Sequence, residues 1–230
     1  MKITTLITLF LLCMCLCASA EVIQRDIEGV PYYLYIPSKY NSSQEYPLIV
    51  ALHWSTAIGM DMLERWREPA EKLSYIVACP NSHNSNYWDI KEEDGRILRM
   101  IEQIEKDYSV DKKRVLVTGF SAGGTYAYYL GIVYPEIFAA SAPLAGSLKW
   151  LISENGLKLS MVKKKTPIYA IYGAKDITVG IEEGRFAQDE LRKYGFQITL
   201  KEISGLDHQY PPFLNWPIIK WFEKLEKQKD

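Results

Sequence analysis

Residues 114–131 read RVLVTGFSAGGTYAYYLG. The apolar run at the start is typical of a buried strand, and the glycines that follow predict a tight turn leading into a helix. Turns of this kind do one of two jobs: they hold the phosphates of a dinucleotide, or they raise a serine hydroxyl for nucleophilic attack. The glycine spacing and the rest of the chain decide between these roles.

A dinucleotide-binding loop requires glycines in the pattern G-x-G-x-x-G near the start of the chain, with an acidic residue about 20 residues further on. The glycines of this turn are Gly119, Gly123 and Gly124, so the spacing differs. A looser pattern, T-G-x-x-x-G-x-G, breaks at Thr125, and the Y-x-x-x-K pair of short-chain dehydrogenases occurs only upstream, at 108–112. We therefore expect no dinucleotide at this turn, and binding of a nicotinamide would favour the alternative.

The serine interpretation fits the turn better, because residues 119–123 form the pattern G-x-S-x-G around Ser121. A sharp turn between strand and helix strains the serine backbone, and side chains two residues away on either side would clash. Glycines at those two positions remove the clash. The helix that follows directs its positive end at the serine, which favours developing negative charge.

A nucleophilic serine in such a turn needs an acid and then a histidine, each after a later strand. Asp176 follows the apolar run 166–173, and His208 follows the run 196–203. The chain has three histidines, and the other two precede Ser121. The sequence therefore predicts that Ser121 attacks an acyl carbon, His208 carries its proton, and Asp176 orients the imidazole.

Two alternatives concern these acids. Asp176 precedes the expected helix 181–194, where an aspartate also serves as a helix cap. Asp207 is a rival partner for His208, but an immediate neighbour is expected to point away from the ring.

The tetrahedral intermediate of acyl transfer needs backbone N–H donors aimed at its oxyanion. The residue directly after the nucleophile supplies one of them, which makes Ala122 the first candidate. The second donor is expected in the loop after the segment LIVALHW (48–54), where Ser55 is the first choice and Trp54 the second.

Strand-like and helix-like segments alternate along the chain, which predicts an α/β fold with a mostly parallel central sheet covered by helices on both faces. Loops at the carboxyl ends of such strands carry the chemistry. No long insertion that would form a lid is found. The strands are expected at 22–37 (a hairpin), 46–54, 75–80, 114–120, 138–146, 166–173 and 196–203, and the helices at 60–74, 93–107, 122–133, 181–194 and 216–228.

The first 20 residues have a lysine, then an apolar run, then Ala-Ser-Ala, as a secretory signal peptide does. Cleavage after Ala20 would leave a single domain, 21–230, in a secreted or periplasmic protein. The apolar run is too short to span a bilayer, which takes about 20 residues. An uncleaved anchor and a lipid anchor on Cys17 are the alternatives, and neither stable membrane insertion nor a particular oligomeric state is predicted.

The charge and cysteine content argue against a nucleic-acid-binding protein and against a protein stabilised by disulfides. The formal net charge is −1, with 24% charged and 48% hydrophobic residues, so no basic face for nucleic acid is indicated. Three of four cysteines lie in the expected leader, which leaves Cys79 as a buried apolar residue without a disulfide partner. No metal site is predicted, and Asn41 begins a glycosylation sequon that matters only in a glycosylating host.

At this point the chain resembles the α/β-hydrolases, and within them the secreted esterases grouped with polyhydroxybutyrate depolymerases, feruloyl esterases and acetyl xylan esterases. This resemblance spans nearly the whole of 21–230 and implies cofactor-free hydrolysis of small-molecule or polysaccharide-linked esters by Ser121, Asp176 and His208. The segments that carry it are PLIVALHW, VDKKRVLVTGFSAGG, YPEIFAASAPLAG, YGAKD and GLDHQYP.

One departure from these relatives is Trp54, which stands where they usually carry glycine. We expect it to alter the oxyanion loop and to narrow the acyl side of the cleft in favour of short acyl groups; packing against the first strands is the alternative. Tyr87, Trp88 and Tyr210 lie in the expected catalytic loops and are candidates for stacking on a sugar or an aromatic acyl group. Their alternative role is to cover the core.

The triad does not report the leaving group, so a phospholipase, a thioesterase and a peptidase remain alternatives to an esterase. A non-catalytic binding protein with a hydrolase fold is an alternative from another class. The presence of all three triad residues argues against it, because a binding module does not need them.

Overall fold

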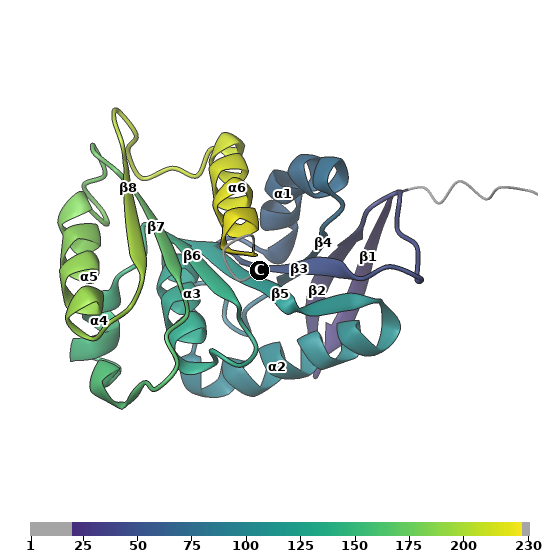
Figure 1. Cartoon of the computed structure of the whole chain (residues 1–230), viewed down its shortest axis with the longest axis horizontal. Coiled ribbons are helices and arrows are strands. Elements are labelled where there is room, and N and C mark those ends of the chain that lie inside the picture. Colours follow the sequence, from purple (N-terminus) through teal and green to yellow (C-terminus); the bar gives the residue numbers. More distant parts are fainter. Residues whose placement is uncertain (1–19, 227–230) are drawn as a thin grey trace, which may run out of the picture.

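The computed structural model describes residues 20–226, so the expected signal peptide lies outside the described residues except for Ala20. Strands and helices alternate along this part of the chain, as predicted (Figure 1). The elements in chain order are β1 (Glu21–Ile27), β2 (Val30–Ile36), β3 (Tyr46–Leu52), α1 (Gly59–Leu73), β4 (Ile76–Pro80), α2 (Ile90–Asp107), β5 (Val110–Phe120), α3 (Ala122–Val133), β6 (Ala140–Leu144), α4 (Leu148–Ser153), the 3₁₀ turn η1 (Leu159–Met161), β7 (Ile168–Gly173), α5 (Ile181–Lys193), β8 (Ile198–Ile203), the 3₁₀ turn η2 (Pro212–Leu214) and α6 (Asn215–Glu226).

The sheet has eight strands in the order β1-β2-β4-β3-β5-β6-β7-β8. Strands β3 to β8 pair in parallel, whereas β1 and β2 form an antiparallel hairpin at one edge. Glu28 and Gly29 turn this hairpin with φ of 56° and 80°, and two positive angles in succession match the twist of the flanking strands. The predicted α/β fold and its hairpin are confirmed.

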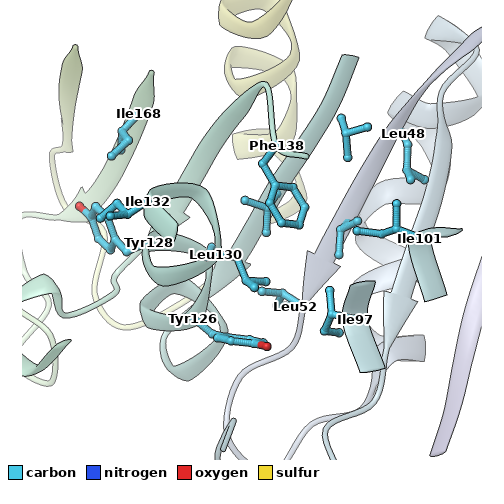
Figure 2. Packing of buried hydrophobic residues seen from close by; sticks show 14 of the residues in the cluster. Leu48, Leu52, Ile97, Ile101, Tyr126, Tyr128, Leu130, Ile132, Phe138 and Ile168 are labelled. Carbon is cyan, nitrogen blue, oxygen red and sulfur yellow. The ribbon is translucent and has the colours of Figure 1, made fainter. Parts of the chain in front are cut away.

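Helices cover both faces of the sheet (Figure 1). Helices α1 and α6 pack on one face through Trp66, Ile218 and Phe222, all of which are buried. Helices α2 to α5 cover the other face, where Figure 2 shows side chains of α2 and α3 meeting those of the strands. Full burial of a large aliphatic or aromatic side chain contributes about 1.5–3 kcal/mol, so these two layers hold the strands in register.

The main differences from expectation concern α2, β5 and α4. Helix α2 begins at Ile90, earlier than predicted, because Asp89 caps it by accepting from the Lys91 N–H at 3.0 Å. Strand β5 begins at Val110, since a register shift lets Tyr46 of β3 pair with Val110. Helix α4 was not predicted, because six residues are too few to show a helical period.

Parallel strands bring their carboxyl ends to one edge of a sheet, and the loops that leave β3, β5, β7 and β8 therefore meet there. Cys79, in β4, is a free thiol whose pKa is raised by burial, as expected of an inert core residue. Between residues 20 and 226, no helix is both long and apolar enough to cross a bilayer.

Candidate active site

Ser121 occupies the turn between β5 and α3 with φ of 56° and ψ of −115°, a conformation that costs energy for any residue other than glycine. The backbone around it is packed too closely for side chains. A Cβ atom on Gly119 would lie 2.3 Å from the Gly123 carbonyl oxygen, and one on Gly123 would lie 2.3 Å from the Leu52 carbonyl oxygen. The steric need for glycine that the sequence predicted is therefore present at both positions.

Three side chains from distant segments form a continuous hydrogen-bond chain. His208 Nε2 lies 3.0 Å from Ser121 Oγ, and His208 Nδ1 lies 2.7 Å from Asp176 Oδ2. Asp176 follows β7 and His208 follows β8, so each stands at the carboxyl end of its strand. The structure thus brings together the serine, histidine and acid that the sequence selected.

Asp176 is held firmly in this chain. Its side chain is only 1% exposed, and its second oxygen, Oδ1, accepts from the backbone N–H groups of Thr178 and Val179 at 2.9 and 2.8 Å. It therefore orders the loop before α5 as well as facing His208, while the residue that caps α5 is Gly180. The rival acid, Asp207, instead accepts from the Gln209 side chain at 3.2 Å.

This geometry sets the roles of the two imidazole nitrogens of His208. Asp176 Oδ2 only accepts, so Nδ1 carries the proton and Nε2 is free to accept from the Ser121 hydroxyl. The ring packs on Phe120 with centroids 4.8 Å apart, and the His208 side chain is 24% exposed. A carboxylate at Nδ1 also stabilises the imidazolium that forms when Nε2 takes a proton.

The loop after β3 is fixed by a second, buried histidine. Ser82 donates its backbone N–H to His53 Nε2 at 3.0 Å, so the His53 proton sits on Nδ1, which donates to the Trp54 carbonyl oxygen at 2.8 Å. Trp88 Nε1 donates to the His53 carbonyl oxygen at 2.9 Å. Burial lowers the pKa of His53 below its ordinary value of 6.5, which keeps the ring neutral.

These contacts orient the candidate oxyanion donors. In a trans peptide the N–H points opposite to the C=O, so fixing the His53 and Trp54 carbonyls also fixes the N–H groups of Trp54 and Ser55. The loop lies against the first turn of α3, since a Cβ atom on Gly123 would sit 2.5 Å from the His53 carbonyl oxygen. Among residues 20–226, the N–H groups of Trp54, Ser55 and Ala122 have no acceptor.

The three aromatic candidates for substrate binding differ in accessibility. Tyr87 is 51% exposed, whereas Trp88 is only 6% exposed and stacks on Tyr126 with centroids 5.3 Å apart. Trp88 therefore supports the loop after β3 and has no open face for a substrate, which corrects the expectation for this residue. Tyr210 is also buried; its hydroxyl donates to Asn215, and its ring forms part of a cavity wall beside His208.

The sequence predicts Trp54 in the cleft but gives no sign that Arg65 and Phe120 belong to its wall. The cavity of about 410 Å³ is also lined by Trp54, Arg65 and Phe120. The Trp54 ring packs edge-on against Phe120, with centroids 5.9 Å apart, and under the Arg65 guanidinium at 4.6 Å. Arg65 lies in the middle of α1 and not in a loop after a strand, so reading strand ends alone could not have found it. Within residues 20–226, no group of three His, Cys, Asp or Glu side chains could hold a metal ion.

Comparisons with known proteins identify the family and the fold of the chain. The family model for phospholipases and carboxylesterases matches residues 76–214. A probable feruloyl esterase C from Aspergillus terreus is 32% identical over 132 residues, which cover 54% of this chain and 49% of that protein. A bifunctional acetylxylan esterase/xylanase from Neocallimastix patriciarum is 27% identical over 193 residues, which cover 80% of this chain and 26% of the enzyme.

The chain thus spans about half the length of the first of these curated relatives and about a quarter of the second. Among solved structures, an acetyl xylan esterase from Aspergillus awamori superimposes with a TM-score of 0.69 at 18% identity, covering 89% of this chain and 99% of that one. This likeness shows a shared fold. Because the family model matches more than half of the chain and the fold agrees, the protein belongs to the phospholipase/carboxylesterase family of α/β-hydrolases.

Proposed function

We propose that the protein is a serine esterase that cleaves carboxylic esters through an acyl-enzyme intermediate. The observation that carries this proposal is the hydrogen-bond chain from Ser121 Oγ through His208 to Asp176, with distances of 3.0 and 2.7 Å. No cofactor is required for this chemistry, because the nucleophile, the base and the orienting acid all belong to the chain.

In the acylation step, Ser121 Oγ forms a bond to the carbonyl carbon of the ester while its proton moves to His208 Nε2. The carbonyl oxygen becomes an oxyanion, which accepts from the N–H groups of Ala122 and of Ser55 or Trp54. The bond from the carbonyl carbon to the alcohol oxygen then breaks, and that oxygen takes the proton from His208. The alcohol leaves, and the acyl group remains on Ser121.

Deacylation repeats these steps with water. His208 Nε2 takes a proton from a water molecule as its oxygen attacks the acyl carbon, and the oxyanion forms again at the same N–H groups. When the bond to Ser121 Oγ breaks, that oxygen recovers its proton from His208, and the carboxylic acid leaves. Asp176 stays ionised throughout and stabilises the imidazolium in both steps.

The substrates that fit this proposal are esters with short acyl groups or acyl groups attached to polysaccharides. Its support is the naming of the similar proteins as feruloyl and acetylxylan esterases. We also propose that residues 1–20 direct export of the protein and that a single domain, residues 21–230, carries out catalysis. Methyl ferulate, acetylated xylan and short polyester oligomers, assayed side by side, would name the preferred ester.

Hydrolysis of p-nitrophenyl acetate by the purified protein tests the reaction itself. We expect turnover by the unmodified protein and its loss in Ser121→Ala, with Ser43→Ala as the matched control in an exposed loop. No turnover by the folded, unmodified protein would favour a non-catalytic binding protein. Activity retained in Ser121→Ala would assign the chemistry to another residue.

A further inference from the structure

The cavity beside His208 contains a cation that the triad does not use. Arg65 reaches it from α1, and Trp54, Phe120 and Tyr210 supply aromatic walls. The guanidinium lies 4.6 Å from the centre of the Trp54 ring and 6.0 Å from that of Tyr210. The N–H groups of an arginine lie in the plane of its guanidinium, so an arginine that stacks on aromatic rings still presents them at its edge. A planar anion can bind at this edge.

The hydrogen bonds of Arg65 leave its charge without a counter-ion. Nε donates to the Tyr210 carbonyl oxygen at 3.2 Å and Nη1 to the Asp61 carbonyl oxygen at 2.8 Å, and both of these acceptors are uncharged. Across residues 20–226, Arg65 forms no salt bridge with a carboxylate, and its Nη2 atom has no acceptor. Arg65 is half-buried, so water screens its charge less than that of an exposed arginine.

The surrounding structure also holds Arg65 in place. The Asn215 side-chain Nδ2 donates to the Arg65 carbonyl oxygen at 2.7 Å. Asn215 Oδ1 in turn accepts from the Tyr210 hydroxyl. These bonds tie α1, the start of α6 and the loop after His208 together. The guanidinium is therefore presented by a rigid wall, which lowers the entropic cost of binding an anion.

We propose that this cavity binds a carboxylate carried by the alcohol portion of the ester substrate, with Arg65 as its partner. This inference rests on the proposed esterase function and specifies the substrate class of the same site. The preferred substrate is thus an ester of an alcohol that bears a carboxylate, either a hydroxy acid or an acidic sugar.

We place the alcohol portion of the ester in this cavity because the cavity adjoins His208. The leaving oxygen must reach His208 Nε2 to receive its proton, and the cavity is lined by His208, by the residues after it and by Phe120, which precedes the nucleophile. Trp54 belongs to the same wall. Trp54 would therefore shape the alcohol side of the cleft, and not the acyl side expected from the sequence.

The test compares two acetate esters with matched leaving groups, 3-carboxyphenyl acetate and 3-carbamoylphenyl acetate, on the unmodified full chain. Each kcat/KM is divided by the rate of uncatalysed hydrolysis of the same ester. We expect the carboxylate ester to be favoured about tenfold at neutral pH and low salt, the size of a single charge-assisted contact. The preference should shrink as salt is added, because the contact is ionic. Equal values for the two esters would overturn the proposal.

Variants assign the preference to one side chain. Arg65→Gln should reduce the ratio of the two kcat/KM values to about one, and Arg65→Lys should retain part of it, because lysine keeps the charge but not the bidentate geometry. Arg67→Gln, on the exposed face of the same helix, is the matched control and should keep the full ratio. A full ratio in Arg65→Gln would overturn the proposal.

Two further comparisons complete the test. Acetylated 3-hydroxybutyrate and acetylated glucuronate, each against its own amide, distinguish a hydroxy acid from an acidic sugar, and no preference in either pair would overturn the proposal. An Arg65-dependent preference for p-nitrophenyl hemisuccinate over p-nitrophenyl butyrate would overturn the placement on the alcohol side. Failure to hydrolyse any of these esters, p-nitrophenyl acetate included, would instead contradict the proposed esterase function.

Discussion

His53 Nδ1 lies 2.8 Å from the carbonyl oxygen of the next residue, Trp54, and donates its proton to it. The ring that makes this contact is buried and is held from its other nitrogen by the Ser82 N–H. A neutral histidine thus acts as a brace for the loop that carries the proposed Trp54 and Ser55 donors. It is a positioning residue, because it acts through the Trp54–Ser55 peptide.

His53→Ala should lower kcat for p-nitrophenyl acetate by about tenfold to hundredfold, with a smaller change in KM. Without the brace, the Trp54–Ser55 peptide can rotate, and losing one oxyanion donor outright costs about 10² to 10³ in rate. Steady-state kinetics on samples whose folding is checked by circular dichroism measure this effect. The control is His83→Ala, at an exposed position. An unchanged kcat in folded His53→Ala would show that the brace is not needed.

The stability of the protein should fall as the pH drops below 6.5, the ordinary pKa of histidine. Burial lowers the pKa of His53 in the folded state, so below pH 6.5 the unfolded chain binds a proton that the folded protein does not. The free energy of unfolding then decreases by up to about 1.4 kcal/mol per pH unit, and the decrease ends below the folded-state pKa. Above pH 6.5 both states are neutral at this residue, and its effect on stability is constant.

Urea unfolding between pH 7.5 and about pH 5 measures this dependence, the lower limit keeping most carboxylates ionised. The His53→Gln variant should show a shallower decrease than the unmodified protein, because glutamine does not titrate. Parallel curves for the two proteins would contradict the assignment to His53.

Gly123→Ala should unfold the protein or destabilise it by at least about 2 kcal/mol, since a buried clash with backbone has no flexible partner to move. The new Cβ atom would lie 2.3 Å from the Leu52 carbonyl oxygen. Gly95→Ala is the matched control inside α2, where the nearest atom is the mobile end of the Arg99 side chain at 3.0 Å. That variant should gain up to about 1 kcal/mol, because alanine favours helix. Thermal unfolding midpoints distinguish the two outcomes.

Asp176→Asn should reduce kcat by a factor on the order of 10⁴ without unfolding the protein. Asp176 Oδ1 accepts from two backbone N–H groups, so the amide oxygen of the substituted side chain would remain there and its NH₂ group would face His208 Nδ1. His208 would then carry its proton on Nε2, which could no longer accept from Ser121. Asp207→Asn is the control and should keep near-normal kcat; the reverse pattern would make Asp207 the functional acid.

Much of the fold could be predicted because its signals are local. The apolar run before Ser121 and the glycines around it act within a few residues. The structure has a strand, a tight turn and a helix there as expected, although β5 begins earlier, at Val110. Asp176 and His208 each follow a strand of a parallel sheet, and this was enough to predict that they meet at one edge of that sheet.

What the sequence could not supply depends on contacts between distant segments. His53 meets Ser82 across 29 residues of sequence and Trp88 across 35, and nothing in their spacing marks them as partners. Trp88 therefore appeared to be a candidate for stacking on a substrate, although it is buried. Arg65 looked like any polar residue of an amphipathic helix, and its place in the cavity emerges only when α1 packs beside the loop after β8.

The central claim is that Ser121 is the nucleophile, and intact-mass spectrometry after reaction with a fluorophosphonate tests it most directly. This reagent forms a stable bond to an activated serine oxygen and releases fluoride. The reaction resembles the acylation step but stops at the covalent adduct. The account predicts one adduct per chain in the unmodified protein, located at Ser121 by peptide mapping, and none in Ser121→Ala. An adduct on another residue, or no adduct on the folded, unmodified protein, would contradict it.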